Sequence, residues 1–312
     1  MAAVADPQQQ LDWEARLRPR VAIAAAFSGL AILGSEVWTT IVFRGGPEVP
    51  GFLESLERAA RPGPIGELET QRLEAYRFYV DNSAQIIGSG VVRALGYLAL
   101  GLVLVFLAAA VRPRNPDYRR ISGIAAMIGS VLVGVALVAY AVGSVNALRD
   151  VVDGARTVDA AGDISGNSLL LMAELLGVSP QSSLAQFLLG LGMLFVCLNA
   201  MRVGLLTKFL GILGVIAGVL TVIPLGPLPV VLGFWLFAVS LLLVGRAPGG
   251  IPPAWRSGKA EPWPSQQELA EERRKRAEAR RGPRPEPEPE PEPVPAGRPH
   301  PASKKRKRKR RG

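Results

Sequence analysis

The sequence predicts an all-α integral membrane protein with six transmembrane helices, both termini in the cytoplasm and a disordered, basic C-terminal tail. Six apolar segments are each about long enough, at ~1.5 Å per residue, to cross most of a ~30 Å hydrocarbon layer. Residues 1–245 hold 17 basic and 17 acidic residues, whereas residues 246–312 hold 19 basic and 9 acidic. The tail therefore accounts for the whole net charge of +10.

The first span is predicted at about residues 21–43. Residues 1–20 are polar and form a cytoplasmic N-terminus that ends in Arg16, Arg18 and Arg20. The apolar run that follows is too long for the apolar part of a signal peptide, and the sequence behind it, GGPEVPG, lacks a small-residue cleavage site. We therefore expect a retained helix.

The middle of the chain alternates between long polar loops and spans. Helical spacing of Leu68, Leu73, Tyr76 and Val80 predicts an amphipathic helix before the second span. A second long loop covers residues 149–183. Its apolar segment 168–178 is too short to span, so it is either an interfacial amphipathic helix or a re-entrant one. The remaining spans are predicted at about 86–111, 121–148, 184–201, 209–225 and 228–244, the last two joined by a Pro-Gly turn.

Basic residues near the ends of the spans predict the orientation. The loop RPRNPDYRR (112–120) carries four arginines, and Arg202 and Lys208 flank another short connection. With the N-terminus inside, all of these cations are cytoplasmic, and the acidic long loops 44–85 and 149–183 face outward. Residues 21–245 thus form a membrane domain with six spans, as expected in a bacterial inner (plasma) membrane.

The cytoplasmic tail, residues 246–312, changes character along its length. Trp255 and Trp263 are expected near lipid headgroups. Residues 265–281 open with a capping box and predict a charged helix, and the Pro-Glu repeat 283–295 predicts a polyproline II rod. The tail ends in eight consecutive cations: Lys304, Lys305, Arg306, Lys307, Arg308, Lys309, Arg310 and Arg311.

This polybasic segment has several possible partners. It can bind anionic lipid headgroups, where each cation near the surface contributes ~1 kcal/mol. Nucleic acid or an acidic protein would satisfy the same charge, and a solvated tail without a partner is the simplest alternative.

Glu36 and Arg93 are the charged residues of interest inside the spans. Each lies about seven residues from the outer end of its helix, or ~10 Å below one surface. Charges at that depth are usually paired. The pair either holds two spans together or forms a substrate or proton site.

Catalytic and metal-binding motifs are missing from the sequence. The sole histidine is His300, in the tail, which excludes Ser-His-Asp catalysis and His-ligated metal sites inside the membrane domain. The sole cysteine, Cys197, is expected to be a small buried residue. We expect no cofactor. Three small-xxx-small pairs favour close helix packing within the chain: Ser130/Gly134, Ala139/Gly143 and Gly214/Gly218.

Two stretches resemble uncharacterised multi-pass membrane proteins of high-GC, actinobacterial-type bacteria: LNAMRVGLLTKFLGILGVIAG (198–218) and PPAWRSGKAEPWPSQQE (252–268). The resemblance implies six spans and no particular activity. We therefore predict a non-enzymatic membrane scaffold whose tail contacts anionic lipid or an acidic partner. The alternative is a small transporter or channel that uses Glu36 and Arg93.

Overall fold

The computed structural model describes residues 7–47, 66–154, 180–223, 229–247, 250–262, 270–271 and 273–276. The chain divides into two units, residues 1–263 and 264–312. The described residues of the second unit are helical. The helices of the first unit are α1 (Pro7–Arg44), α3 (Gly66–Asp81), α4 (Ser83–Val111), α5 (Ile121–Gly154), α7 (Pro180–Arg202), α8 (Lys208–Val222), α9 (Val230–Val244) and α10 (Ala254–Ser257).

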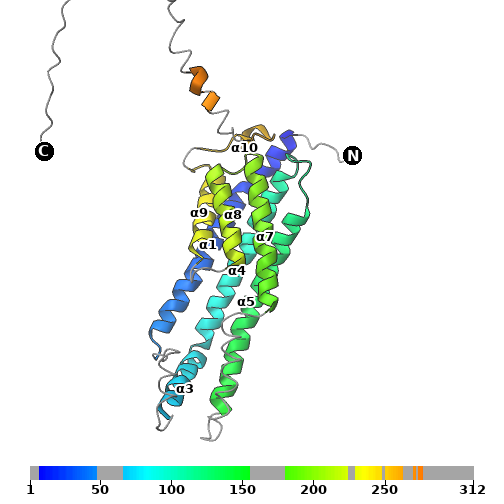
Figure 1. Ribbon diagram of the computed structural model, residues 1–312. Coiled ribbons are helices and arrows are strands. Elements are labelled where there is room, and N and C mark those ends of the chain that lie inside the picture. Colours follow the sequence, from blue (N-terminus) through cyan, green and yellow to red (C-terminus); the bar gives the residue numbers. More distant parts are fainter. Residues whose placement is uncertain are drawn as a thin grey trace, which may run out of the picture. The chain divides into compact units, whose positions relative to one another are not determined.

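The long helices of this unit form a closed ring. In chain order, α1, α4, α5, α7, α8 and α9 each pack against the next, and α9 returns to α1. Helix α4 also contacts α7 across the ring. Figure 1 shows that α8 and α9 occupy only the half of the bundle that carries α10, whereas α1, α4 and α5 continue past them toward α3.

The prediction of transmembrane helices is confirmed in its coarse form. Among the described residues, four helices, α1, α4, α5 and α7, are long and apolar enough to cross a membrane. Helices α8 and α9 have 15 residues each, which is about 22 Å and shorter than a ~30 Å layer. The expected amphipathic helix before the second span is α3.

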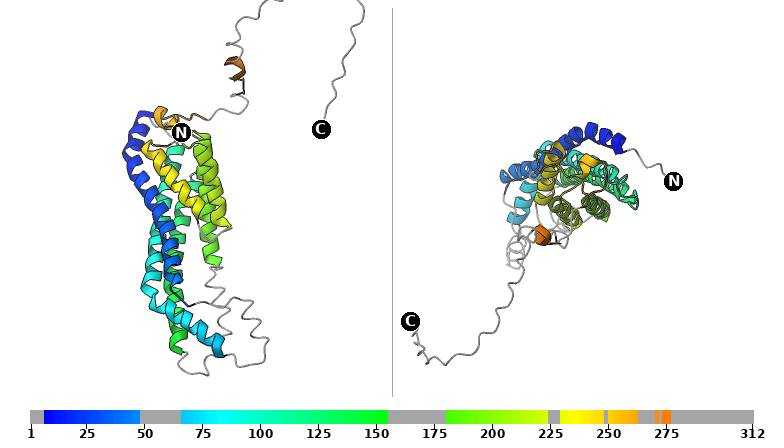
Figure 2. Two further views of the ribbon diagram at one scale, coloured as in Figure 1. Left: turned by 90° about the vertical axis from the view of Figure 1, so that its left-hand side faces the viewer. Right: turned by 90° about the horizontal axis from the view of Figure 1, so that it is seen from above.

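Helix α1 differs most from expectation, because it begins at Pro7 rather than near Val21. It runs through Pro19, whose missing N–H removes one helical hydrogen bond. Trp13, Leu17 and Val21, spaced four residues apart, pack against the core. The N-terminal part of α1 leans across the end of the bundle (Figure 2).

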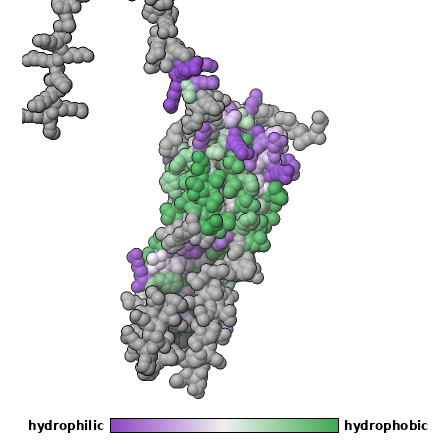
Figure 3. All heavy atoms as spheres, in the orientation of Figure 1, coloured by the Kyte–Doolittle hydropathy of each residue, from purple (hydrophilic) through white to green (hydrophobic). Residues whose placement is uncertain are grey.

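A wide apolar surface surrounds the ring. Large apolar side chains are exposed on every helix of the ring, including Ile23 at 70% and Leu102 at 64%. On the face drawn in Figure 3, this surface forms a continuous band below a polar end. Exposed apolar surface on this scale is unusual for a soluble monomer and marks contact with a membrane or a partner.

Glycines bring the backbones of α5, α7 and α8 into direct contact. A Cβ at Gly129 of α5 would lie 2.3 Å from Leu189 N of α7, and one at Gly190 would lie 2.4 Å from Gly218 O of α8. Such contact is typical of helices that pack inside a bilayer.

Two of the three small-xxx-small predictions are confirmed. Gly214 and Gly218 face α7, with Cys197 buried beside Gly214, and Ser130 meets Gly101 of α4. The Ala139/Gly143 prediction is wrong for the part of the chain that the structure describes, because Ala139 is exposed and no described atom lies within 4 Å of a Cβ at Gly143. That part of α5 lies beyond the short helices.

Replacing Gly192 tests the helix contact. In Gly192→Ala, the new Cβ would lie 2.5 Å from Ala126 N, a backbone atom that cannot move aside easily. We expect overpacking to cost ~1–3 kcal/mol and to lower the thermal unfolding midpoint of the detergent-solubilised protein. Gly143→Ala is the matched control and should leave the midpoint unchanged. Equal losses in the two variants would contradict direct backbone contact.

Candidate functional site

The interface between α1 and α4 holds the expected pair of charges. The Arg93 Nη2 and Glu36 Oε2 atoms are 3.0 Å apart, and Arg93 Nε donates to Ser35 Oγ at 3.1 Å. Each of the two charged side chains is about one-fifth exposed. The sequence therefore identified both members of the ion pair. The pair joins α1 to α4, as expected if its role is to hold two spans together.

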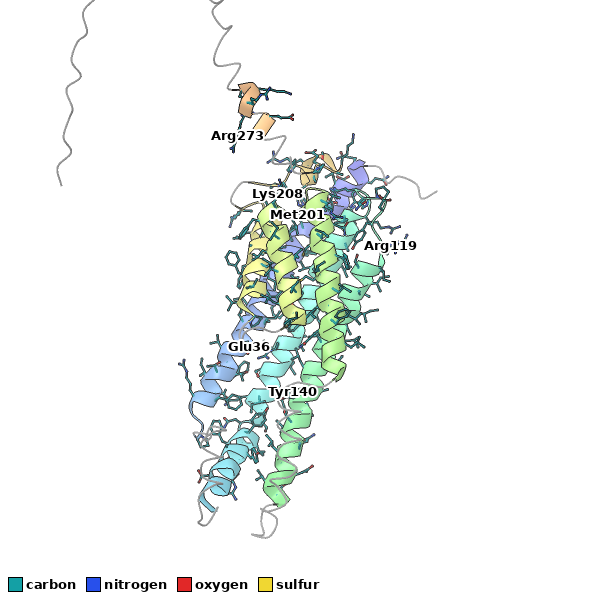
Figure 4. All side chains as sticks on the ribbon, viewed as in Figure 1. Glu36, Arg119, Tyr140, Met201, Lys208 and Arg273 are labelled. Atoms are coloured by element: carbon teal, nitrogen blue, oxygen red, sulfur yellow. The ribbon has the colours of Figure 1, made fainter. Side chains whose placement is uncertain are left out.

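This ion pair lies level with the lower ends of the short helices. Gly233, near the start of α9, packs on Leu33 of α1, and Glu36 follows Leu33 by less than one turn. Figure 4 places Glu36 just below the ends of α8 and α9, close in height to Tyr140 of α5. Both α1 and α4 continue beyond it, to Arg44 and back to Ser83 respectively.

A second ion pair joins α1 to the segment after α4, and the sequence analysis missed it. Glu14 and Arg114 are both fully buried, with 0% side-chain exposure. Their contact is bidentate: Arg114 Nη1 donates to Glu14 Oε1, and Arg114 Nη2 donates to Glu14 Oε2 at 2.9 Å. Two parallel charge-assisted hydrogen bonds fix both position and orientation.

The same guanidinium also holds a later part of the chain. Arg114 Nη2 donates to the Ala254 carbonyl at 2.8 Å, and Nη1 donates to the Ala110 carbonyl at the end of α4. Ala254 belongs to residues 250–262, which include α10 and which we call the cap. One buried arginine thus binds α1, the end of α4 and the cap.

Trp255 anchors the cap, which corrects the expectation that it lies near lipid headgroups. The side chain is 2% exposed, and its indole N–H donates to the Leu205 carbonyl at 2.8 Å. Its ring stacks on Phe106, at 5.9 Å between centroids, and Phe106 stacks on Trp13 at 5.6 Å. Because α10 is short and polar, its sequence does not predict that Trp255 is buried.

Backbone contacts hold the far end of the cap against the α7–α8 connection. Glu261 N donates to the Val203 carbonyl at 3.1 Å. Gly204 has a φ of 79°, and a Cβ there would lie 2.1 Å from Glu261 O. Only glycine fits a left-handed position with a backbone so close. The two stretches that carry the family resemblance therefore pack together.

Cations dominate the end of the bundle that carries the cap. Exposed basic side chains there come from several segments: Arg16, Arg20, Arg112, Arg119, Arg120, Arg202, Lys208, Arg246, Arg256 and Lys259. Arg119 and Lys208 are visible at this end in Figure 4. Burial raises the pKa of the Tyr118 phenol in the same region, so Tyr118 adds no negative charge at neutral pH.

The polybasic segment 304–311 and the apolar segment 168–178 lie outside the described residues. Across the part of the chain that the structure describes, no three His, Cys, Asp or Glu side chains gather in a way that could hold a metal ion.

Comparisons with known proteins give no further guide. No protein-family model matches the chain. Searches of the curated proteins and of the solved structures find no significant similarity either.

The fully buried pair of Glu14 and Arg114 should contribute far more to stability than the pair of Glu36 and Arg93, whose side chains are about one-fifth exposed. Glu14→Gln or Arg114→Met leaves one buried charge without its partner, which costs ~3–5 kcal/mol. Glu36→Gln should cost less, because solvent screens that pair. Thermal unfolding of the singles and of Glu14→Gln/Arg114→Met checks this. The double variant should be more stable than the sum of its singles implies, and additive losses would contradict the coupling.

Proposed function

We propose that this chain is a six-span protein of a bacterial plasma membrane that acts as a non-enzymatic scaffold. Its function is to present a cationic C-terminal segment at the cytoplasmic face. The observation that carries this proposal is the cap, because its buried contacts fix residues 250–262 to the cationic end of the helical unit. The sequence that follows, with its eight terminal cations, therefore starts at that end.

The apolar layer of the bundle supports the membrane assignment. Along α4, the distance from Arg93 to Val111 is about 27 Å at 1.5 Å per residue, close to the ~30 Å of a hydrocarbon core. Helices α8 and α9 cover most of the same layer. In this placement Glu36 and Arg93 lie at its outer boundary rather than ~10 Å inside it, and α8 ends and α9 begins near that boundary.

Charge supports the orientation. The end with the cap exposes cations from five separate segments, which is the pattern of a cytoplasmic face. Trp38 and Phe43, which follow Glu36 on α1, are exposed at 40% and 42% and suit the opposite interface, where aromatic side chains are enriched.

Ion-pair geometry favours the scaffold over the transporter alternative. The Glu36 carboxylate is already bound by Arg93, and Arg93 also bonds Ser35. Both residues face each other between neighbouring helices of the ring. A structural role for the pair needs nothing more than these contacts.

Cysteine labelling tests the orientation. Asp81 and Asp150 are exposed at the end away from the cap, and Asp117 is exposed beside it. The natural Cys197 is 0% exposed and should stay unlabelled. With an impermeant maleimide on intact cells, Asp81→Cys and Asp150→Cys should react, and Asp117→Cys should react only after permeabilisation. Reaction of Asp117→Cys from outside would reverse the proposed topology.

Vesicle binding tests the role of the tail. A peptide of residues 264–312 should bind vesicles that contain phosphatidylglycerol and should ignore pure phosphatidylcholine. Binding should fall steeply with added salt, since charge attraction is screened over ~8 Å at physiological ionic strength. A peptide of residues 264–303, which lacks the polybasic segment, is the control. Equal binding to neutral vesicles would exclude a lipid role, and removal from anionic vesicles by DNA at the same salt would favour nucleic acid instead.

A further inference from the structure

An apolar groove of about 280 Å³ runs along the outside of the bundle between α1 and α4. Helix α1 lines it with Trp13, Leu17, Arg20, Val21 and Ala24, and α4 lines it with Leu102, Val105, Phe106 and Ala109. From Trp13 to Ala24 it extends about 16 Å along α1. Arg20 is the charged side chain among these residues.

Arg20 lines the groove between Leu17 and Val21, about one turn before its apolar end at Ala24, and side chains on a helix extend toward its N-terminus. Arg20 is exposed and has no hydrogen-bond or ion-pair partner among the residues that the structure describes. Arg16 and Arg112 are exposed nearby in sequence, four residues before Arg20 and three residues after Ala109. The apolar end reaches Ala24 and Leu102, within the exposed apolar band that also contains Ile23.

From this arrangement we infer that the groove binds one anionic phospholipid of the cytoplasmic leaflet. An acyl chain lies along the apolar walls, and the phosphate pairs with Arg20. A phosphodiester accepts charge-assisted hydrogen bonds from a guanidinium, and a cation near the membrane surface attracts an anionic headgroup. This site uses none of the tail residues, so it is independent of the proposed role of the tail, but it rests on the proposed membrane placement and orientation.

Charge distribution favours lipid over a second copy of the chain. Two copies that met through this groove on a two-fold axis in the usual parallel orientation would bring Arg16 and Arg20 of both chains together. Like charges at close range oppose such contact. A phospholipid instead matches both features of the groove, with its anion at the arginines and a hydrocarbon chain along the apolar walls.

Trp13 provides a direct readout in the full-length protein. The protein is placed in phosphatidylcholine bilayers with a minor fraction of lipid brominated on its acyl chains, either phosphatidylglycerol or phosphatidylcholine. The contribution of Trp13 is obtained by subtracting the tryptophan fluorescence of the Trp13→Phe variant from that of the natural chain. Brominated phosphatidylglycerol should occupy the site about fivefold more than brominated phosphatidylcholine, the ratio that corresponds to ~1 kcal/mol per cation.

Matched variants separate the groove from general surface charge. Arg20→Gln should abolish the preference, and Arg119→Gln, which removes an exposed arginine at the same end but outside the groove, should keep it. Equal quenching by the two lipids would overturn the inference. So would equal effects of the two arginine variants, or no quenching by either lipid, which would mean that another segment or copy covers the groove.

A groove-filling variant gives a second measurement. Ala109→Phe should reduce the phosphatidylglycerol that co-purifies with the protein, measured by mass spectrometry. Val135→Phe, on the exposed surface of α5, should not. Tail binding to headgroups is the same in all of these variants, so failure here leaves the tail proposal intact, and failure of the vesicle test leaves the groove intact.

Discussion

The buried bond between Glu14 and Arg114 connects parts of the chain that are far apart in sequence. Arg114 has 0% exposure, so its charge must be satisfied inside the protein, and it binds a carboxylate of α1, the Ala110 carbonyl and the Ala254 carbonyl of the cap. Removing any of these acceptors leaves donors of a buried cation unpaired. The start of α1, the end of α4 and the cap are therefore interdependent, and they set the point from which the rest of the tail continues.

Much of the fold could be predicted from the sequence, because apolar runs of span length leave few alternatives to helices. The ends of helices were less predictable. Helix α1 starts at Pro7, since Trp13, Leu17 and Val21 give a polar segment one apolar face that packs on the bundle. The four-residue spacing of these three side chains is present in the sequence. The charged residues between Asp12 and Arg20, however, make the segment polar overall and so do not favour a helix that packs on the bundle.

The site was predictable only in part, for a physical reason. Glu36 and Arg93 stand out because each is a charge within an apolar run. Glu14 and Arg114 lie among many charged neighbours, and nothing in the sequence shows that these two side chains are buried. Trp255 and Leu205 belong to the two stretches that carry the family resemblance, yet their hydrogen bond joins residues 50 positions apart and depends on tertiary structure.

The two ion pairs together fix the register between α1 and α4. Between the two ion pairs, the residues that α1 and α4 present to each other are mostly apolar, and many of them are small. In a bilayer, sliding one such helix along the other carries no hydrophobic penalty. Ser28 Oγ, which donates to the Gly96 carbonyl at 2.8 Å, adds one polar contact near the middle. A slip of one turn, about 5.4 Å, would separate Glu36 from Arg93 and Glu14 from Arg114 at once. The charges at the two ends of the apolar layer thus specify an alignment that the layer itself does not.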